Sequence, residues 1–352
     1  MAANTGTDLL ELIGVSKEFH VRSGGRRATL SAVDTVSLTV RQGTTLGIVG
    51  ESGCGKSTLA RVIVGLHLAE GGEMIFDGKQ VLTHRRRSPT ELKQMQMVFQ
   101  DPSSALNPRA TISESIGFPL QVQGESRAAI DERVATVMRD VGLPAAYASY
   151  YPHQLSGGQR QRVNIARALA LQPKLVVLDE AVSALDKSIQ AQVLNLLTDL
   201  QEEYGLTYVF ISHDLNVVRY ISDDVAVMYL GQVVERGSAQ ELYDNPKHPY
   251  TQLLLSSIPT LDPTESTRDE PMDGSVREAV GGAVGGSDTK DTEIPSPIDP
   301  PSGCRFRTRC PFAMDVCSQL APVPVTIDDT HSVSCHLYAE ADADADQRQV
   351  PA

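Results

Sequence analysis

The chain has 352 residues and a mass of 38.0 kDa, a size that favours one large domain with a smaller appendage. Hydrophobic residues make up 41 % and charged residues 21 % of it, which excludes a wholly disordered chain. The formal net charge of −13 argues against nucleic acid as a partner, although −10 of it lies within residues 261–303 and 339–352.

The sequence carries no signal for insertion into a membrane or for secretion. No stretch approaches the roughly 20 apolar residues that a membrane-spanning helix needs. Residues 1–14 lack a basic region followed by an apolar core, so we expect no signal peptide and a cytosolic chain.

Strand and helix patterns alternate over residues 1–260. The valines and leucine at 36, 38 and 40 alternate with polar residues, as in a half-buried strand. Short apolar runs at 46–49, 175–178 and 208–211 fit strands that are buried on both faces of a mainly parallel sheet. Helical stripes at 130–141 and 189–204 end at Gly142 and Gly205. We therefore predict an α/β fold.

The composition changes after residue 260. Residues 261–302 are rich in Pro, Gly, Ser, Thr and acidic residues, which predicts a flexible acidic linker. A compact cysteine-containing module is predicted over 303–340, and residues 341–352 are expected to form an acidic tail.

A phosphate-binding pattern follows the run at 46–49. It consists of Gly50, Glu51, Ser52, Gly53, Cys54, Gly55, Lys56 and Ser57, which match G-x-x-x-x-G-K-[ST]. A predicted helix over 58–66, opened by Thr58, provides the context that this pattern requires. Backbone N–H groups of such a loop point at phosphate oxygens, and the helix N-terminus favours an anion. We expect Lys56 to contact the β- and γ-phosphates, Ser57 to bind Mg²⁺, and Cys54 to be a small filler.

Two acidic residues end the buried run at 175–178. Asp179 would emerge at the carboxyl edge of the sheet, where α/β proteins bind ligands. It is expected to hold the magnesium ion, and Glu180 is expected to polarise an attacking water.

A second phosphate-facing element lies about 100 residues after the first. Ser156 is a natural N-cap, and the glycines of Leu155-Ser156-Gly157-Gly158-Gln159 leave N–H groups open to a phosphate. One nucleotide does not need both elements from one chain. The pattern therefore predicts a head-to-tail dimer with each ATP between the loop of one chain and the Ser-Gly-Gly turn of the other.

Together these motifs resemble the nucleotide-binding subunits of ATP-binding cassette (ABC) transporters. The order matches that family: the Walker A loop at 50–57, the Q-loop residue Gln100, the signature at 155–159, Walker B at 175–180, the D-loop residue Asp186 and the switch residue His213. The resemblance implies an ABC-type P-loop NTPase domain with a RecA-like sheet core and a helical subdomain over about 101–170.

The resemblance also implies roles for single residues. Ser57, Asp179 and Gln100 would hold Mg²⁺, Glu180 would act as the general base, and His213 would contact the γ-phosphate. The partner's ATP would be completed by Ser156, Gly157, Gly158 and Gln159, with Asp186 linking the two sites. Phe19 stands where the family places an aromatic ring against adenine, although a buried core position is the alternative. Lys187 departs from the apolar residue that is usual there.

Further segments resemble the oligopeptide and dipeptide importer ATPases. They are Gln100-Asp101-Pro102 with Leu106-Asn107-Pro108-Arg109, residues 214–218 and 228–231, and Asn245-Pro246-Lys247-His248-Pro249-Tyr250-Thr251. The branch implies two transmembrane permease subunits, a second and paralogous ATPase chain, and an extracytoplasmic solute-binding protein. The chain would sit peripherally at the cytoplasmic face of the membrane. Nickel or a sugar remains an alternative solute, and a soluble non-transport ABC ATPase is the alternative function.

Four cysteines mark the C-terminal module. Cys304, Cys310, Cys317 and Cys335 are spaced C-x5-C-x6-C-x17-C, which is neither a common zinc ribbon nor a ferredoxin run. In a reducing compartment the spacing leaves iron–sulfur, zinc, unligated thiols or disulfides open. Resemblance to the C-terminal element of peptide-importer ATPases implies a [4Fe-4S] cluster. In the zinc alternative, His331 or His336 could replace a thiolate.

Overall fold

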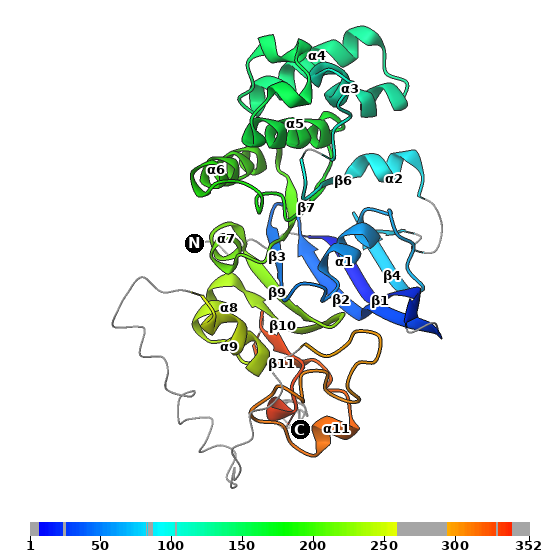
Figure 1. Ribbon diagram of the computed structural model, residues 1–352, viewed down its shortest axis with the longest axis vertical. Coiled ribbons are helices and arrows are strands. Elements are labelled where there is room, and N and C mark those ends of the chain that lie inside the picture. Colours follow the sequence, from blue (N-terminus) through cyan, green and yellow to red (C-terminus); the bar gives the residue numbers. More distant parts are fainter. Residues whose placement is uncertain are drawn as a thin grey trace, which may run out of the picture.

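A computed structural model describes residues 7–23, 26–81, 83, 87–102, 104–258, 294–328 and 330–339 (Figure 1). The described part contains a four-stranded antiparallel sheet and an eight-stranded mixed sheet. Residues 261–293 of the predicted linker and all of the predicted tail over 341–352 lie outside the described residues, whereas 294–302 are described.

The eight-stranded sheet carries the predicted buried strands at its centre. Its order is β11-β12-β10-β9-β3-β8-β7-β6, and the five strands from β9 to β6 are mutually parallel. The strands are β3 (Thr45–Val49), β6 (Met95–Val98), β7 (Leu175–Asp179), β8 (Thr207–Ile211), β9 (Asp224–Tyr229), β10 (Gln232–Ser238), β11 (Val325–Thr326) and β12 (Ser332–Val333). The runs predicted at 46–49, 175–178 and 208–211 are confirmed as β3, β7 and β8.

Alternate residues of these strands face two separate hydrophobic cores. Val177 and Ile48 belong to the core shared with the antiparallel sheet, whereas Val176 and Leu178 face the core on the helical side. This arrangement explains why the strands are apolar throughout instead of alternating.

The antiparallel sheet closes over one face of the main sheet. Its order is β2-β1-β4-β5, with β1 (Asp8–Ser23), β2 (Arg26–Arg41), β4 (Gly71–Phe76) and β5 (Lys79–Val81). Val36, Leu38 and Val40 are buried on β2, so the half-buried strand predicted there is confirmed.

The helices flank the main sheet, and three of them form a group of their own at the top of Figure 1. They are α1 (Lys56–Ile63), α2 (Pro89–Gln94), α3 (Ile112–Val122), α4 (Arg127–Asp140), α5 (Gly157–Ala170), α6 (Lys187–Tyr204), α7 (Leu215–Ile221), α8 (Ala239–Asp244), α9 (Pro249–Ser256) and α11 (Val316–Gln319), with 3-10 turns at Ala145–Ser149, Pro152–Gln154 and His336–Tyr338. Helices α3, α4 and α5 pack on one another, and all three lie within residues 101–170. The stripes predicted at 130–141 and 189–204 are α4 and α6, and Gly205 caps α6 at φ 62°.

The cysteine-containing segment is joined to the main sheet. Strand β12 pairs with β10, and β11 pairs with β12, so this segment extends the sheet by two short strands. Phe306 is 1 % exposed in the helical-side core. Within the described part of the chain, no helix combines the length and apolar character needed to cross a bilayer.

Candidate functional site

The phosphate loop runs from the end of β3 to the start of α1. Gly50, Gly53 and Gly55 have φ values of 147°, 82° and 108°, which favour glycine. A Cβ on Gly50 would lie 2.1 Å from the carbonyl oxygen of Met228, and one on Gly55 would lie 2.0 Å from that of Ala32. The two glycines therefore let the loop press against neighbouring backbone. Ser52 and Gly53 are exposed at its tip, while Thr58 lies half-buried on α1.

Lys56 lies folded inside the loop. Its side chain is buried, and Nζ donates to the carbonyl oxygens of Gly50 at 2.7 Å and Glu51 at 3.0 Å. The ammonium group is thus at the concave side of the loop, where phosphate oxygens could replace the carbonyls. Burial raises the pKa of the Cys54 thiol, which fits the predicted filler and not a nucleophile.

Two of the three predicted magnesium ligands, Ser57 and Asp179, are in direct contact. Ser57 at the start of α1 donates from Oγ to Oδ1 of Asp179 at 2.8 Å, although the residues lie 122 positions apart. Asp179 is 3 % exposed at the end of β7, and burial raises the pKa of its carboxyl group. A buried carboxylate beside a hydroxyl is a donor set that suits a hard divalent cation.

Glu180 contacts the other two predicted catalytic residues, Gln100 and His213. Its carboxylate accepts a hydrogen bond from Nε2 of Gln100 at 2.7 Å and lies 3.4 Å from Nδ1 of His213. Its backbone has φ 49°, an uncommon conformation for a residue other than glycine, and its N–H donates to Ile211 at 2.9 Å. This backbone conformation follows the end of β7 directly, and the Glu180 carboxylate contacts Gln100 and His213.

The signature turn caps α5. Ser156 Oγ accepts from the Gln159 N–H at 3.3 Å, and Gln159 Oε1 accepts from the Ser156 N–H at 2.9 Å, which forms a capping box. A Cβ on Gly158 would meet Cγ2 of Ile189 at 2.5 Å, so close packing on α6 also demands this glycine. In Figure 1, α5 belongs to the upper helical group, well separated from α1 and the phosphate loop.

The D-loop leads directly into α6. Asp186 is the N-cap residue of α6 and is exposed, and its side chain makes no capping hydrogen bond. The neighbouring Lys187 donates from Nζ to Oδ2 of Asp214 at 2.7 Å, next to His213. The residue that departs from the family pattern thus links the D-loop to the switch segment.

Phe19 lies half-buried on β1. Its ring contacts that of His67 edge-on at 5.4 Å, and Nζ of Lys17 lies 5.1 Å from its centre. A fully buried core position, the alternative for this residue, does not match this exposure.

The four C-terminal cysteines gather around one small cavity of about 10 Å³, together with Phe306, Phe312 and His336. All four are free of disulfides. Burial raises the pKa of the Cys335 thiol to about 12. His331 does not line this cavity; its Nε2 pairs instead with the buried Glu235 at 2.7 Å, so its predicted part in a zinc site is wrong. His336 does line the cavity with the thiols, as does His248.

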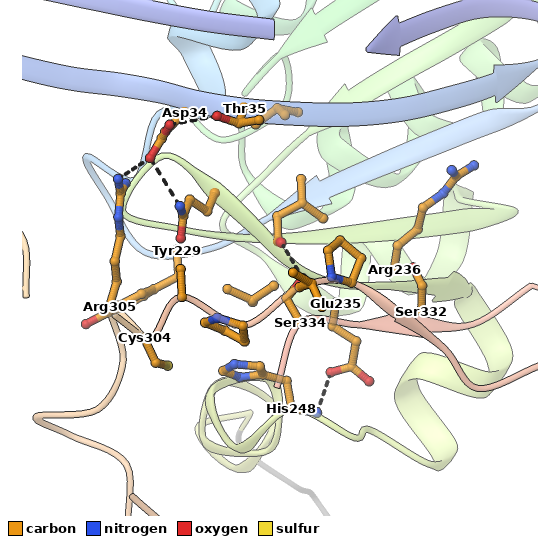
Figure 2. Close-up of a pocket in the computed structure, with 18 of the residues that line it drawn as sticks. Asp34, Thr35, Tyr229, Glu235, Arg236, His248, Cys304, Arg305, Ser332 and Ser334 are labelled. Atoms are coloured by element: carbon orange, nitrogen blue, oxygen red, sulfur yellow. Dashed lines mark hydrogen bonds and ion pairs between the residues drawn. The ribbon is translucent and has the colours of Figure 1, made fainter. Parts of the chain in front are cut away.

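Sequence reasoning missed two residues that contact the phosphate loop. Arg309 makes a bidentate ion pair with Glu51, and the Tyr250 hydroxyl accepts the Glu51 backbone N–H at 2.9 Å. Tyr250 and Arg309 both lie in segments that resemble the peptide-importer branch, but no local signal indicates that either residue contacts the phosphate loop. A larger cavity of about 410 Å³ lies nearby between β2, β10 and the C-terminal segment, and none of the phosphate-site residues lines it (Figure 2).

Comparison with known proteins decides the family. Residues 33–183 match the family model for ABC transporters, and residues 234–287 and 284–317 match that for the oligopeptide/dipeptide transporter C-terminal region. The oligopeptide transport ATP-binding protein AppF of Bacillus subtilis is 47 % identical over 96 % of this chain and 99 % of its own. The chain belongs to the ATP-binding subunits of ABC transporters, in the oligopeptide/dipeptide branch.

Other relatives and solved structures support membership of the same family. The oligopeptide transport ATP-binding protein OppF of Salmonella typhimurium is 48 % identical over 93 % of this chain and 95 % of its own. Among solved structures, cbiO1 from Clostridium perfringens superposes with a TM-score of 0.59 at 27 % identity, over 68 % of this chain and 91 % of its own. The ATP-binding cassette MJ0796, solved as a dimer bound to ADP and phosphate, superposes with a TM-score of 0.57 at 30 % identity. The match covers 65 % of this chain and 98 % of that chain. The predicted ABC-type α/β fold is confirmed, and the chain is an ATPase subunit of a transporter.

Proposed function

We propose that this ABC ATPase drives the import of oligopeptides or dipeptides. The observation that carries the proposal is the alignment with a B. subtilis oligopeptide transport protein over 99 % of that protein's length, C-terminal region included. A nickel or sugar importer would need the same ATPase chemistry, so the substrate has to be tested directly.

ATP hydrolysis in this proposal works by positioning and charge neutralisation. The loop N–H groups and Lys56 bind the phosphates, while Ser57 and Asp179 hold Mg²⁺ together with Gln100. Glu180 orients and deprotonates the attacking water, and His213 contacts the γ-phosphate. The contacts of Gln100 and His213 with Glu180 support this assignment, because they place all three groups in one cluster.

The signature turn serves a second ATPase chain. Ser156, Gly157, Gly158 and Gln159 lie on α5, in the helical group that Figure 1 shows apart from α1. A head-to-tail dimer would bring the turn of one chain to the loop of the other, and the similar MJ0796 cassette has been solved as a dimer. We expect the second chain to be a paralogue and Asp186 to link the two sites.

The membrane partners follow from the same proposal. Two permease subunits would carry the transport path and dock near Gln100 and the helical region at 101–142. An extracytoplasmic solute-binding protein would deliver the peptide. The chain would then lie at the cytoplasmic face of the membrane, held there by the permease subunits.

The four cysteines line one cavity and form no disulfide, which supports a shared metal centre. The resemblance to peptide-importer ATPases favours iron–sulfur over zinc. We propose that Cys304, Cys310, Cys317 and Cys335 hold a [4Fe-4S] cluster in a structural role. Iron and zinc content with the visible absorption of anaerobically purified protein tests this assignment.

Uptake by cells that lack the gene tests the transport function. Cells complemented with the wild-type chain should take up labelled short peptides, and cells complemented with Glu180→Gln should not. Uptake of labelled nickel or sugar, with peptide uptake absent, would replace the peptide assignment. Membrane pull-down should recover permease subunits, and their absence would favour a non-transport ATPase.

A further inference from the structure

We infer that Arg309 is a positioning residue of the nucleotide site, because it neutralises and fixes Glu51 within the phosphate loop. The loop is then held by two distant parts of the chain, and the cysteine-containing segment is a necessary part of the ATP-binding unit. This inference requires ATP binding only and does not depend on the transported solute.

The contact between the two residues is close and bidentate. Nη1 and Nη2 of Arg309 donate to Oε2 and Oε1 of Glu51 at 2.8 and 2.9 Å, across 258 positions of sequence. The side chains are only 10 % and 24 % exposed. The guanidinium group also lies 5.8 and 5.7 Å from the ring centres of Tyr229 and Phe306, which restrict its position. Such a fork geometry fixes orientation as well as charge.

Glu51 places a carboxylate within the phosphate loop. It directly follows Gly50 in a loop that must bind a triphosphate, and a free carboxylate there would repel the anion. Its backbone N–H donates to the Tyr250 hydroxyl at 2.9 Å, so this amide is not directed at a ligand. Glu51 therefore anchors the outside of the loop through both its backbone and its side chain.

A second contact joins the same segment to the other end of the loop. Arg305 donates to the carbonyl oxygen of Leu230. It also forms an ion pair with Asp34, which Figure 2 shows. The next residue, Gly231, donates its N–H to the Cys54 carbonyl at 2.8 Å. Arg305 and Arg309 each adjoin a cysteine of the cluster, Cys304 and Cys310, so the fold of the cysteine segment sets the position of both arginines.

Nucleotide titration of the full-length chain tests the inference with a fluorescent ATP analogue. Arg309→Met keeps the side-chain stem and leaves Glu51 uncompensated, so affinity should fall about tenfold, or about 1.4 kcal/mol. Adding Glu51→Gln should restore affinity to within about threefold of Glu51→Gln alone. In ATPase assays the loss should appear in KM, with kcat changed less than about twofold.

The matched control is Arg307→Met in the same segment. The Arg307 side chain donates to Ser302, at 2.9 Å to its carbonyl oxygen and 3.3 Å to its hydroxyl, and in the described part of the chain it makes no hydrogen bond or ion pair with the phosphate loop. Arg307→Met should therefore leave affinity unchanged. Wild-type affinity in Arg309→Met would overturn the inference, as would a double variant as weak as Arg309→Met. If Arg309→Met alone does not fold, the double variant Arg309→Met with Glu51→Gln still supports charge compensation, provided that it folds and binds ATP. If neither variant folds, the role of Arg309 is purely structural and the inference is overturned. Failure of the wild-type chain to bind ATP would instead overturn the ATPase assignment.

Discussion

The amide of Gln100 donates a 2.7 Å hydrogen bond to the carboxylate of Glu180, which joins the Q-loop to the residue proposed as general base. The same carboxylate lies 3.4 Å from Nδ1 of His213. Three segments that are distant in sequence thus converge on one oxygen atom. A change at any of them is expected to reorient the group that activates water.

Glu180→Gln should retain ATP binding and lose turnover. The amide preserves the shape of the side chain but accepts no proton, so ATPase activity should fall at least about 100-fold. With ATP bound and not hydrolysed, the closed dimer should accumulate and elute as the larger species in size-exclusion chromatography. Glu202→Gln, at an exposed position on α6, provides the control. Normal turnover in Glu180→Gln would remove this carboxylate from the mechanism.

Of the two signature glycines, Gly157 should tolerate substitution by alanine and Gly158 should not. A Cβ on Gly158 would meet Ile189 Cγ2 at 2.5 Å, whereas one on Gly157 would meet Leu185 at an ordinary 3.7 Å. Gly158→Ala should therefore lower the free energy of unfolding of the isolated chain by about 1 to 3 kcal/mol, and Gly157→Ala should not. Thermal unfolding measures both, and adding Ile189→Ala to Gly158→Ala should relieve the clash. Equal stability of the two alanine variants would show that α6 adjusts.

The link between Lys187 and Asp214 should contribute little to stability, unlike the helix cap next to it. Lys187 is 82 % exposed, so Lys187→Met should cost less than about 1 kcal/mol. Asp214 also caps α7 by accepting from Asn216 at 3.1 Å and Val217 at 3.4 Å. Asp214→Asn keeps a capping oxygen, whereas Asp214→Ala loses it and should cost about 1 kcal/mol more. Thermal unfolding of the three variants would contradict this division if Lys187→Met proved the most damaging.

The sequence predicted the elements whose signals are local. The apolar runs that became β3, β7 and β8 are buried on both faces, and Gly205 ends α6 as its position indicated. The phosphate loop, Asp179 and Ser156 could be predicted for the same reason, because such residues at such spacing suit a phosphate and its metal. Gln100, Asp186 and His213 could be predicted only from the resemblance to the ABC family.

Contacts that depend on the tertiary fold left no such signal. Strand β12 has two residues and no periodicity, so its pairing with β10 could not be predicted. The ion pair of Arg309 with Glu51 joins residues 258 positions apart. His331 was placed with the cysteines because it is near Cys335 in sequence, but the β11–β12 hairpin carries it to Glu235. Closeness of His331 to Cys335 in sequence therefore did not indicate closeness in space, because the β11–β12 hairpin places His331 beside Glu235.

His248 should make the chain less stable in mild acid. It is 1 % exposed, its backbone N–H donates to the buried Glu235 at 2.9 Å, and its Nδ1 accepts the Tyr250 N–H at 3.0 Å. Burial lowers the pKa of this imidazole from 6.5 to about 4, against the opposing charge of Glu235. Between these two values the unfolded chain binds a proton that the folded chain does not. Stability is therefore full above pH 6.5 and falls as the pH is lowered toward 4, by up to about 3 kcal/mol.

His248→Asn separates this titration from other effects of acid. Asparagine offers a capping oxygen for α9 in place of Nδ1 but binds no proton in this range. Urea unfolding between pH 8 and pH 4.5 should show a shallower decline for His248→Asn than for the wild type, whatever its stability at pH 8. His153→Asn, which replaces an exposed imidazole stacked on Tyr151, should keep the wild-type slope. Parallel curves for His248→Asn and wild type would mean that protonation of the buried imidazole does not limit stability, and that the acid sensitivity arises elsewhere.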